Sequence, residues 1–195
     1  MKRLFDIFFS LLTLIVMSPI LLIIAIAIKL TSAGPIFYCS KRVGEKGKLL
    51  DLIKFRSMVV DAPQKGPNIT RNGDNRITNI GKILRKYKLD ELPQFFNVLK
   101  GDMSIVGPRP EDPTYVARYS PEQLQVLCVK PGITSPASIK YRDEEQILTG
   151  ENWQEKYINE IMPAKISIDL EYIKHQSLLN DLYIIYKTVF AVFNE

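Results

Sequence analysis

Residues 88–102 read Lys-Leu-Asp-Glu-Leu-Pro-Gln-Phe-Phe-Asn-Val-Leu-Lys-Gly-Asp and place two adjacent carboxylates, Asp90 and Glu91, just before a proline. Proline is tolerated in the first turn of a helix but not deep inside one, so Pro93 predicts a helix that begins near Asp90. Apolar residues at helical spacing would bury one side of this helix. Backbone N–H groups at a helix start favour an ionised carboxylate and bound anions. Asp90 is therefore a candidate phosphoryl-transfer nucleophile, with a plain capping role as the alternative.

The composition indicates one domain that binds anionic partners. The chain has 195 residues, 46% of them hydrophobic, and a net charge of +5. This balance suits an anionic membrane surface or a phosphorylated substrate. Nucleic acid is not expected as a partner, because the sequence has no zinc-ligand spacing, recognition-helix pattern or aromatic RNA motif. Two distant cysteines and a single histidine argue against a disulfide framework and a histidine metal cluster, and they indicate a reducing cytoplasm.

Residues 1–34 are the predicted membrane anchor. Residues 7–28 form an uncharged, mostly apolar run that is long enough to span a bilayer, and basic residues flank both of its ends. Ser18 and Pro19 lie at its centre, where proline breaks or kinks a helix. Because basic residues favour the cytoplasmic side, we expect a re-entrant hairpin whose two ends lie on the same face. A kinked single span is the alternative.

A β-hairpin is predicted directly after the anchor. Residues 36–43 and 49–58 have strand character and are separated by a short loop that contains glycine. The two-residue period of a strand places Lys54 and Arg56 on one face. These two cations either meet a phosphate or form an ordinary solvated strand edge.

Further positive charge is expected around the carboxylates. Arg109 lies between two prolines that fix an extended loop, so its guanidinium is presented with little ordering entropy left to lose. Arg85, in a helical pattern before the carboxylates, and Arg142, after a second stiff turn, are further candidates. These arginines would supply the charge that a diphosphate requires.

The predicted fold class is α+β and predominantly helical. The re-entrant helix and the small hairpin are followed by helical patterns over residues 78–87 and 166–193. The second pattern suits either an amphipathic helix in the membrane interface or a helix in a core. We therefore expect one cytoplasmic catalytic domain at the membrane interface, over residues 35–195.

Taken together, these features resemble the monotopic phosphoglycosyl transferases, also called the bacterial sugar transferase family, in what looks like the minimal catalytic form. The resemblance covers nearly the whole chain. It is carried by the apolar segment with Ser18 and Pro19 and by residues 54–58, 89–94, 97–104, 106–110 and 130–134.

The resemblance implies transfer of a phosphosugar from a UDP-sugar to a polyprenyl phosphate, which gives a polyprenyl diphosphate sugar and UMP. It implies that Asp90 is the nucleophile, that Glu91 is linked to Mg²⁺, and that Arg85, Arg109 and Arg142 lie near the donor. It also implies a monotopic protein on the cytoplasmic face of the bacterial inner membrane, in the first step of a surface glycan pathway. A homo-oligomer is left open.

The sequence departs from the family over residues 135–141, where many relatives have glycine, a short apolar pair, glutamine and Asn-Gly. We therefore expect different donor contacts from this loop and a different sugar specificity.

In the expected mechanism Asp90 attacks the sugar-linked phosphorus, UMP leaves, and polyprenyl phosphate takes the phosphosugar. The alternatives are a membrane-bound adaptor of glycan assembly and a direct ternary-complex transferase in which Asp90 binds metal.

Overall fold

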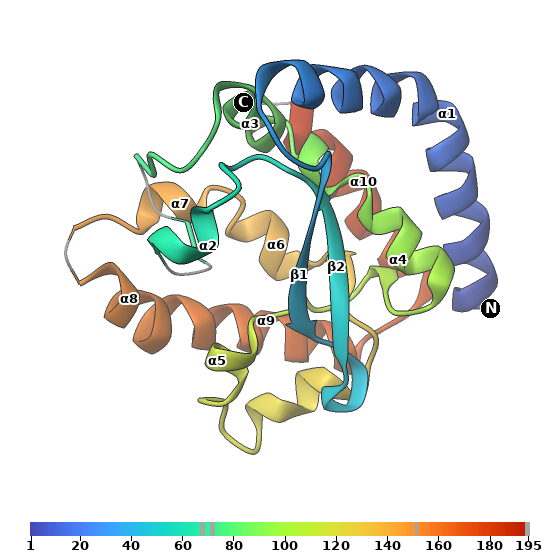
Figure 1. Ribbon diagram of the computed structural model, residues 1–195. Coiled ribbons are helices and arrows are strands. Elements are labelled where there is room, and N and C mark those ends of the chain that lie inside the picture. The colour runs from blue at the N-terminus through green and yellow to red at the C-terminus, as the bar shows by residue number, and fades with distance from the viewer. Residues whose placement is uncertain (67–68, 71–72, 151, 194–195) are drawn as a thin grey trace.

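The computed structural model describes residues 1–66, 69–70, 73–150 and 152–193 (Figure 1). Its helices are α1 (Lys2–Thr31), α2 (Ala62–Lys65), α3 (Asn79–Lys86), α4 (Gln94–Lys100), α5 (Pro113–Val116), α6 (Pro136–Lys140), α7 (Glu144–Ile147), α8 (Trp153–Lys156), α9 (Met162–Lys174) and α10 (Leu178–Phe193). Its strands are β1 (Phe37–Val43), β2 (Leu49–Phe55), β3 (Ser104–Val106) and β4 (Gly132–Thr134). The predicted class, mostly helical with a small sheet, is confirmed.

The predicted hairpin is present, and it lies in the middle of the molecule in Figure 1. Strands β1 and β2 pair antiparallel, with Phe37 opposite Phe55. Strand β2 ends at Phe55, whereas the sequence pattern extended it to residue 58, so Arg56 lies just beyond the strand. Asn97 of α4 fastens the helix to β2, because its Oδ1 accepts from Ile53 N at 3.0 Å and its Nδ2 donates to the Asp51 carbonyl at 2.7 Å. The hairpin and α4 therefore form one unit.

A second, parallel strand pair was not predicted from the sequence. Ser104 of β3 pairs with Gly132 of β4, which brings together two proline-containing loops that are far apart in the chain. Two glycines permit this approach, since a Cβ on Gly132 would lie 2.1 Å from the Gly107 nitrogen. The pairing places the loop that carries Arg109 against a rigid neighbour.

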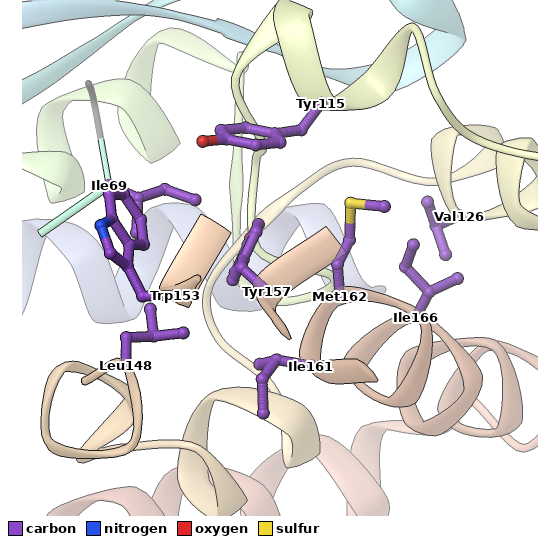
Figure 2. Packing of buried hydrophobic residues seen from close by; sticks show 9 residues of the cluster. All are labelled: Ile69, Tyr115, Val126, Leu148, Trp153, Tyr157, Ile161, Met162 and Ile166. Atoms are coloured by element: carbon purple, nitrogen blue, oxygen red, sulfur yellow. The ribbon is translucent and has the colours of Figure 1, made fainter. Parts of the chain in front are cut away.

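The largest apolar cluster lies around α9 and the helical turns that precede it. Its buried members are Ile69, Tyr115, Val126, Leu148, Trp153, Tyr157, Ile161, Met162 and Ile166. Figure 2 shows the Tyr115 ring of α5 above the others, and it meets the Tyr157 ring edge-on at a centroid distance of 5.2 Å. This cluster supports one wall of the cavity described below, to which Ile69 and Tyr157 also contribute.

Helix α1 is one continuous helix, and among the described residues it is the helix that is long and apolar enough to cross a membrane. Of the two effects predicted at Ser18 and Pro19, a full break is absent, because Pro19 lies inside the helix and the Ser18 hydroxyl donates to the Ile15 carbonyl at 2.8 Å. Figure 1 nevertheless shows the helix rising beside the body and then turning across the top. A proline inside a helix bends it without ending it when the neighbouring turns keep their hydrogen bonds.

Both ends of α1 pack on the rest of the protein. Near the start, Asp6 is buried and accepts from Ile105 N of β3 at 3.1 Å. Near the end, Ile24 and Ile28 are buried against Phe55 and Leu84. Between these contacts the helix exposes large apolar side chains: Leu11, Leu12, Ile15, Val16, Ile20, Leu22 and Ile23. The arrangement is compatible with a re-entrant helix, and insertion through one face stays a prediction.

The start of α1 is fixed by a buried polar network. Lys2 forms an ion pair with Asp181 of α10 and donates to the Val106 carbonyl at 3.0 Å. Tyr172 of α9 donates to the same Asp181 carboxylate at 2.5 Å. The Asp181 side chain is 1% exposed, so its charge depends on these partners. One carboxylate thereby joins the anchor to β3, α9 and α10.

Replacing Asp181 with alanine should destabilise the protein by about 3 kcal/mol, because it leaves Lys2 and Tyr172 without their shared acceptor. Thermal unfolding in detergent measures this loss. The matched control is Lys174→Ala, which removes an exposed ion pair with Glu171 and should cost at most about 0.5 kcal/mol. Equal effects of the two substitutions would contradict the structural role of Asp181.

Candidate active site

A cavity of about 380 Å³ lies between the hairpin, the carboxylate turn and the loop after β3. We call it the charged cavity. Its ionisable lining residues are Arg42, Lys54, Arg56, Arg76, Arg85, Asp90, Arg109, Glu111, Glu144, Glu145 and Lys165, with Tyr38 and Tyr157. Most of the cations and one of the two carboxylates predicted from sequence therefore line a single space.

The turn that carries the two carboxylates differs from the prediction. The expected helix start near Asp90 is wrong, because α4 begins at Gln94 with Pro93 as its N-cap residue. Leu89–Glu91 form a short 3₁₀ turn, and Lys88 before it has the left-handed φ of 54°. Tight 3₁₀ turns are common just before α-helices. Asp90 consequently caps no helix, and its environment has to be described from its own contacts.

Glu91 is clamped by two cations. Lys54 Nζ lies 3.1 Å from Glu91 Oε1, and Arg109 donates from Nη1 to Oε2 at 3.0 Å and from Nη2 to Oε1 at 2.5 Å. Burial tends to raise the pKa of Glu91, but Arg109 and Lys54 outweigh it and hold this pKa well below its usual range. Glu91 in turn raises the pKa of Arg109. Glu91 is therefore a permanent anion in this cluster.

Asp90, unlike Glu91, is not paired with a cation among the described residues. It is 5% exposed, and no hydrogen-bond donor among the described residues contacts its carboxylate. Burial, and next the charge of Glu91, raise the pKa of Asp90 above its ordinary value, while Lys54, Arg85 and Lys88 oppose the rise. The expected helix start at Asp90 is therefore absent, and burial acts against the ionised form of this carboxyl. Asp90 is thus a carboxyl group in the cavity lining with no hydrogen-bond partner among the described residues, beside Glu91, whose two oxygens both accept from cations.

The other predicted cations are distributed unequally. Lys54, Arg56, Arg85 and Arg109 line the charged cavity, whereas Arg142 does not. The structure shows the Arg142 backbone carbonyl accepting from Lys88 Nζ at 3.2 Å. The predicted contact of Arg142 with the donor stays a prediction.

Sequence reasoning missed an acidic side of the cavity. Glu111 accepts from the Tyr157 hydroxyl and, at 3.4 Å, from Arg42 Nη1. Glu144 pairs with Lys165 of α9, and the next residue, Glu145, pairs with Arg85. A signal existed for Glu111, which directly follows the Arg109 loop, but nothing local indicated that α9 supplies the partner of Glu144.

Asp169 is a second missed residue, and it supports the loop that departs from the family pattern. This buried carboxylate of α9 accepts from Ala137 N at 3.4 Å, at the start of α6. Burial raises the pKa of Asp169 to about 6, although hydrogen bonds from Ser135 and from the Ala137 and Arg109 backbones act against this rise. Asp169 therefore links α9 to residues 135–137 and to the Arg109 loop.

The comparison of sequences decides the family. The sequence model described as bacterial sugar transferase matches residues 1–195. The chain belongs to the bacterial sugar transferase family. Similar proteins are a UDP-glucose:undecaprenyl-phosphate glucose-1-phosphate transferase of Klebsiella pneumoniae, 47% identical over 98% of this chain, and a UDP-N-acetylgalactosamine-undecaprenyl-phosphate N-acetylgalactosaminephosphotransferase of Aeromonas hydrophila, 38% identical over 96%.

This family member spans only 40% and 42% of the lengths of those two relatives. A UDP-glucose:undecaprenyl-phosphate glucose-1-phosphate transferase of Caulobacter vibrioides is 37% identical over 96% of this chain and 68% of its own length. The shared region is therefore the part that contains the charged cavity and α1.

The elevated pKa of Asp169 predicts a pH-dependent stability. The folded state holds this proton more tightly than the unfolded state, so its contribution is complete at low pH and is lost as the pH rises through about 6. Relative to Asp169→Asn, the wild type should lose up to about 3 kcal/mol between pH 4 and pH 7. Thermal unfolding of both proteins across this range is the measurement. A difference that does not change with pH would contradict the raised pKa.

Proposed function

We propose that this protein is a phosphoglycosyl transferase that moves a phosphosugar from a UDP-sugar to a polyprenyl phosphate, giving a polyprenyl diphosphate sugar and UMP. The observation that supports the proposal is Asp90, a buried carboxyl in a cavity lined by cations, for which the described part of the chain supplies no hydrogen-bond partner. The relatives support the substrate class, because their names join a UDP-sugar or a sugar phosphate to undecaprenyl phosphate.

The charged cavity suits two anionic substrates. Lys54, Arg85 and Arg109 would neutralise the donor diphosphate, which lowers the repulsion between the substrate and the attacking carboxylate. Glu91 would act by holding Lys54 and Arg109 in position. Arg142 is not a lining residue of the cavity, so a contact between its side chain and the donor would form beyond the lining.

The proposed exchange has two displacements. An Asp90 carboxylate oxygen forms a bond to the sugar-linked phosphorus, and the bond from this phosphorus to the bridging oxygen breaks, so UMP leaves with the electron pair. An oxygen of polyprenyl phosphate then attacks the same phosphorus, and the aspartyl bond breaks to restore the carboxylate. The attack uses the ionised form of Asp90, which burial disfavours and the charges of Lys54, Arg85 and Lys88 favour.

Magnesium is a further part of the proposal. A carboxylate offers about four lone-pair sites, and the bonds from Lys54 and Arg109 use three of those on Glu91, so one is left for a metal. Mg²⁺ needs only one or two protein carboxylates when water and substrate phosphates complete its shell. The ion would supply charge neutralisation at the phosphates.

The proposed location is the cytoplasmic face of the bacterial inner membrane, as a monotopic protein in the first step of a surface glycan pathway. Both ends of α1 pack on the same body, which supports a re-entrant helix over residues 1–34 and a single catalytic domain over residues 35–195. Helix α10 buries Ile184 and exposes Leu179, Tyr183, Tyr186, Val189 and Phe190, which suits the membrane interface.

The direct test of this function is UMP release by the purified protein with a panel of UDP-sugars, with and without polyprenyl phosphate. Turnover with at least one UDP-sugar and a requirement for the acceptor are expected. Asp90→Asn should abolish product formation, because it keeps the size of the side chain but removes the nucleophilic anion. Asp51→Asn, an exposed hairpin residue, should keep wild-type turnover. No turnover with any donor would contradict the proposal and favour a membrane adaptor.

Glu91→Gln should remove most turnover and also reduce stability, because Lys54 and Arg109 would lose their shared anion. Wild-type turnover should require Mg²⁺ and stop after chelation. Both are measured as UMP release with graded Mg²⁺, beside thermal unfolding of the variant. Unchanged activity after exhaustive chelation would contradict the magnesium role.

Replacing Ser18 and Pro19 with leucine should straighten α1 and favour a true span. The measurement is labelling of a cysteine added at the amino terminus in intact inverted vesicles, with exposed Cys39 as the reference for the side of the catalytic domain. In the wild type both cysteines should react from the same side. Labelling of the amino terminus from the opposite side in the wild type would contradict the re-entrant anchor.

A further inference from the structure

Arg56 is a buried cation, and two of its nitrogen donors have no hydrogen-bond partner among the described residues. It is 4% exposed and lines the charged cavity. Its Nη2 donates to the carbonyl of Ser32 at 2.9 Å and to the Ser32 hydroxyl at 2.7 Å, just after the end of α1. Its Nε and Nη1 have no hydrogen-bond partner in the part of the chain that the structure describes. Buried charged donors are costly when unpaired, so this guanidinium is suited to an anion.

Arg56 Nη1 lies close to Gly34 and to the Val60 side chain. Gly34 has φ +117°, and a Cβ at this position would lie 2.1 Å from Nη1 and 2.6 Å from Val60 Cγ2. The guanidinium, the backbone of Gly34 and the Val60 side chain therefore meet at one point. Glycine is required here because only its missing Cβ lets the chain pass so close.

An apolar rim continues from this point along the cavity. It consists of Pro35, Phe37, Tyr38 and Val60, all of which line the cavity. Val60 is 59% exposed, Phe37 44% and Tyr38 39%. The rim begins a few residues after α1, where Leu30 is 80% exposed. An exposed apolar edge that continues from the membrane helix suits a hydrocarbon chain rather than a nucleotide sugar.

Another part of the cavity lining is polar. Arg42, Glu111 and Tyr157 are joined by hydrogen bonds, and Glu144 pairs with Lys165 beside them. Carboxylates and hydroxyls in such a cluster suit the hydroxyl groups of a sugar nucleotide. The lining of one cavity thus contains both an apolar and a polar group of side chains, together with Asp90.

We propose that Arg56 binds the phosphate of the lipid-linked acceptor and that the apolar rim receives the first prenyl units of its chain. This assignment rests on the proposed function and deepens it, because it separates the acceptor side of the cavity from the donor side. The prenyl phosphate is the one occupant that matches both a buried cation with unused donors and an apolar rim next to the membrane helix.

The first test places a negative charge on the rim. Val60→Asp should raise the KM for polyprenyl phosphate about tenfold through repulsion of its phosphate, and leave the KM for the UDP-sugar within about twofold. Val60 is exposed, so the substitution does not disturb a core. The matched control is Leu49→Asp, which adds the same charge to an exposed apolar position of the hairpin outside the cavity and should change neither KM.

The second test changes the cation. Arg56→Lys keeps the charge but loses the guanidinium fork, so it should raise the KM for polyprenyl phosphate about tenfold with little change for the donor. Binding of farnesyl phosphate and of inorganic phosphate, measured by calorimetry without any donor, provides a readout that needs no turnover. Farnesyl phosphate should bind more tightly than inorganic phosphate in the wild type, and Val60→Asp should remove this preference.

The possible outcomes are distinct. A changed donor KM with an unchanged acceptor KM in either variant would assign Arg56 and the rim to the donor and overturn the proposal. Unchanged values for both substrates in both variants, or equal binding of farnesyl and inorganic phosphate in the wild type, would also overturn it. Absence of UMP release from the wild type with every UDP-sugar would instead contradict the proposed function, and the farnesyl phosphate preference would then still decide the binding site.

Discussion

The ion-pair cluster around Glu91 is the interaction on which the site depends. It joins Lys54 from β2 and Arg109 from the loop after β3 to the turn that carries both carboxylates. Removing Glu91 would leave Lys54 and Arg109 without their shared anion. The cluster also explains why adjacent carboxylates differ: the cations neutralise Glu91, whereas Asp90 keeps no partner and a raised pKa. Such a division between two neighbouring acids is typical of functional sites.

The rest of the fold keeps this cluster in place relative to the long apolar helix α1. Asn97 ties α4 to β2, and the close approach of Gly107 and Gly132 supports the loop of Arg109. Lys2 and Asp181 fix one end of α1, and Arg56 holds Ser32 just after the other end. The same body that forms the cavity thereby holds both ends of α1, so the cavity and the exposed apolar middle of α1 keep a fixed relative position.

Local patterns predicted the local features. Alternation and a glycine loop were enough for the hairpin, and an uncharged apolar run was enough for α1. They failed where distant residues decide the outcome: the β3–β4 pairing, the Glu111–Tyr157 contact and the Glu144–Lys165 pair all join segments that no sequence period connects. The predicted helix start was misplaced because proline fits both the first turn and the N-cap position of a helix. In the structure, Pro93 occupies the N-cap position of α4.

The central claim is that the free carboxyl of Asp90, and not the clamped carboxylate of Glu91, forms a bond to phosphorus. Incubation of the protein with a UDP-sugar that it turns over, without acceptor, followed by peptide mass spectrometry, tests this claim most directly. The account predicts about one UMP released per protein and a phosphosugar mass on the peptide that contains Asp90, absent in Asp90→Asn. No adduct, and no UMP until polyprenyl phosphate is added, would contradict it and support a direct transfer in a ternary complex.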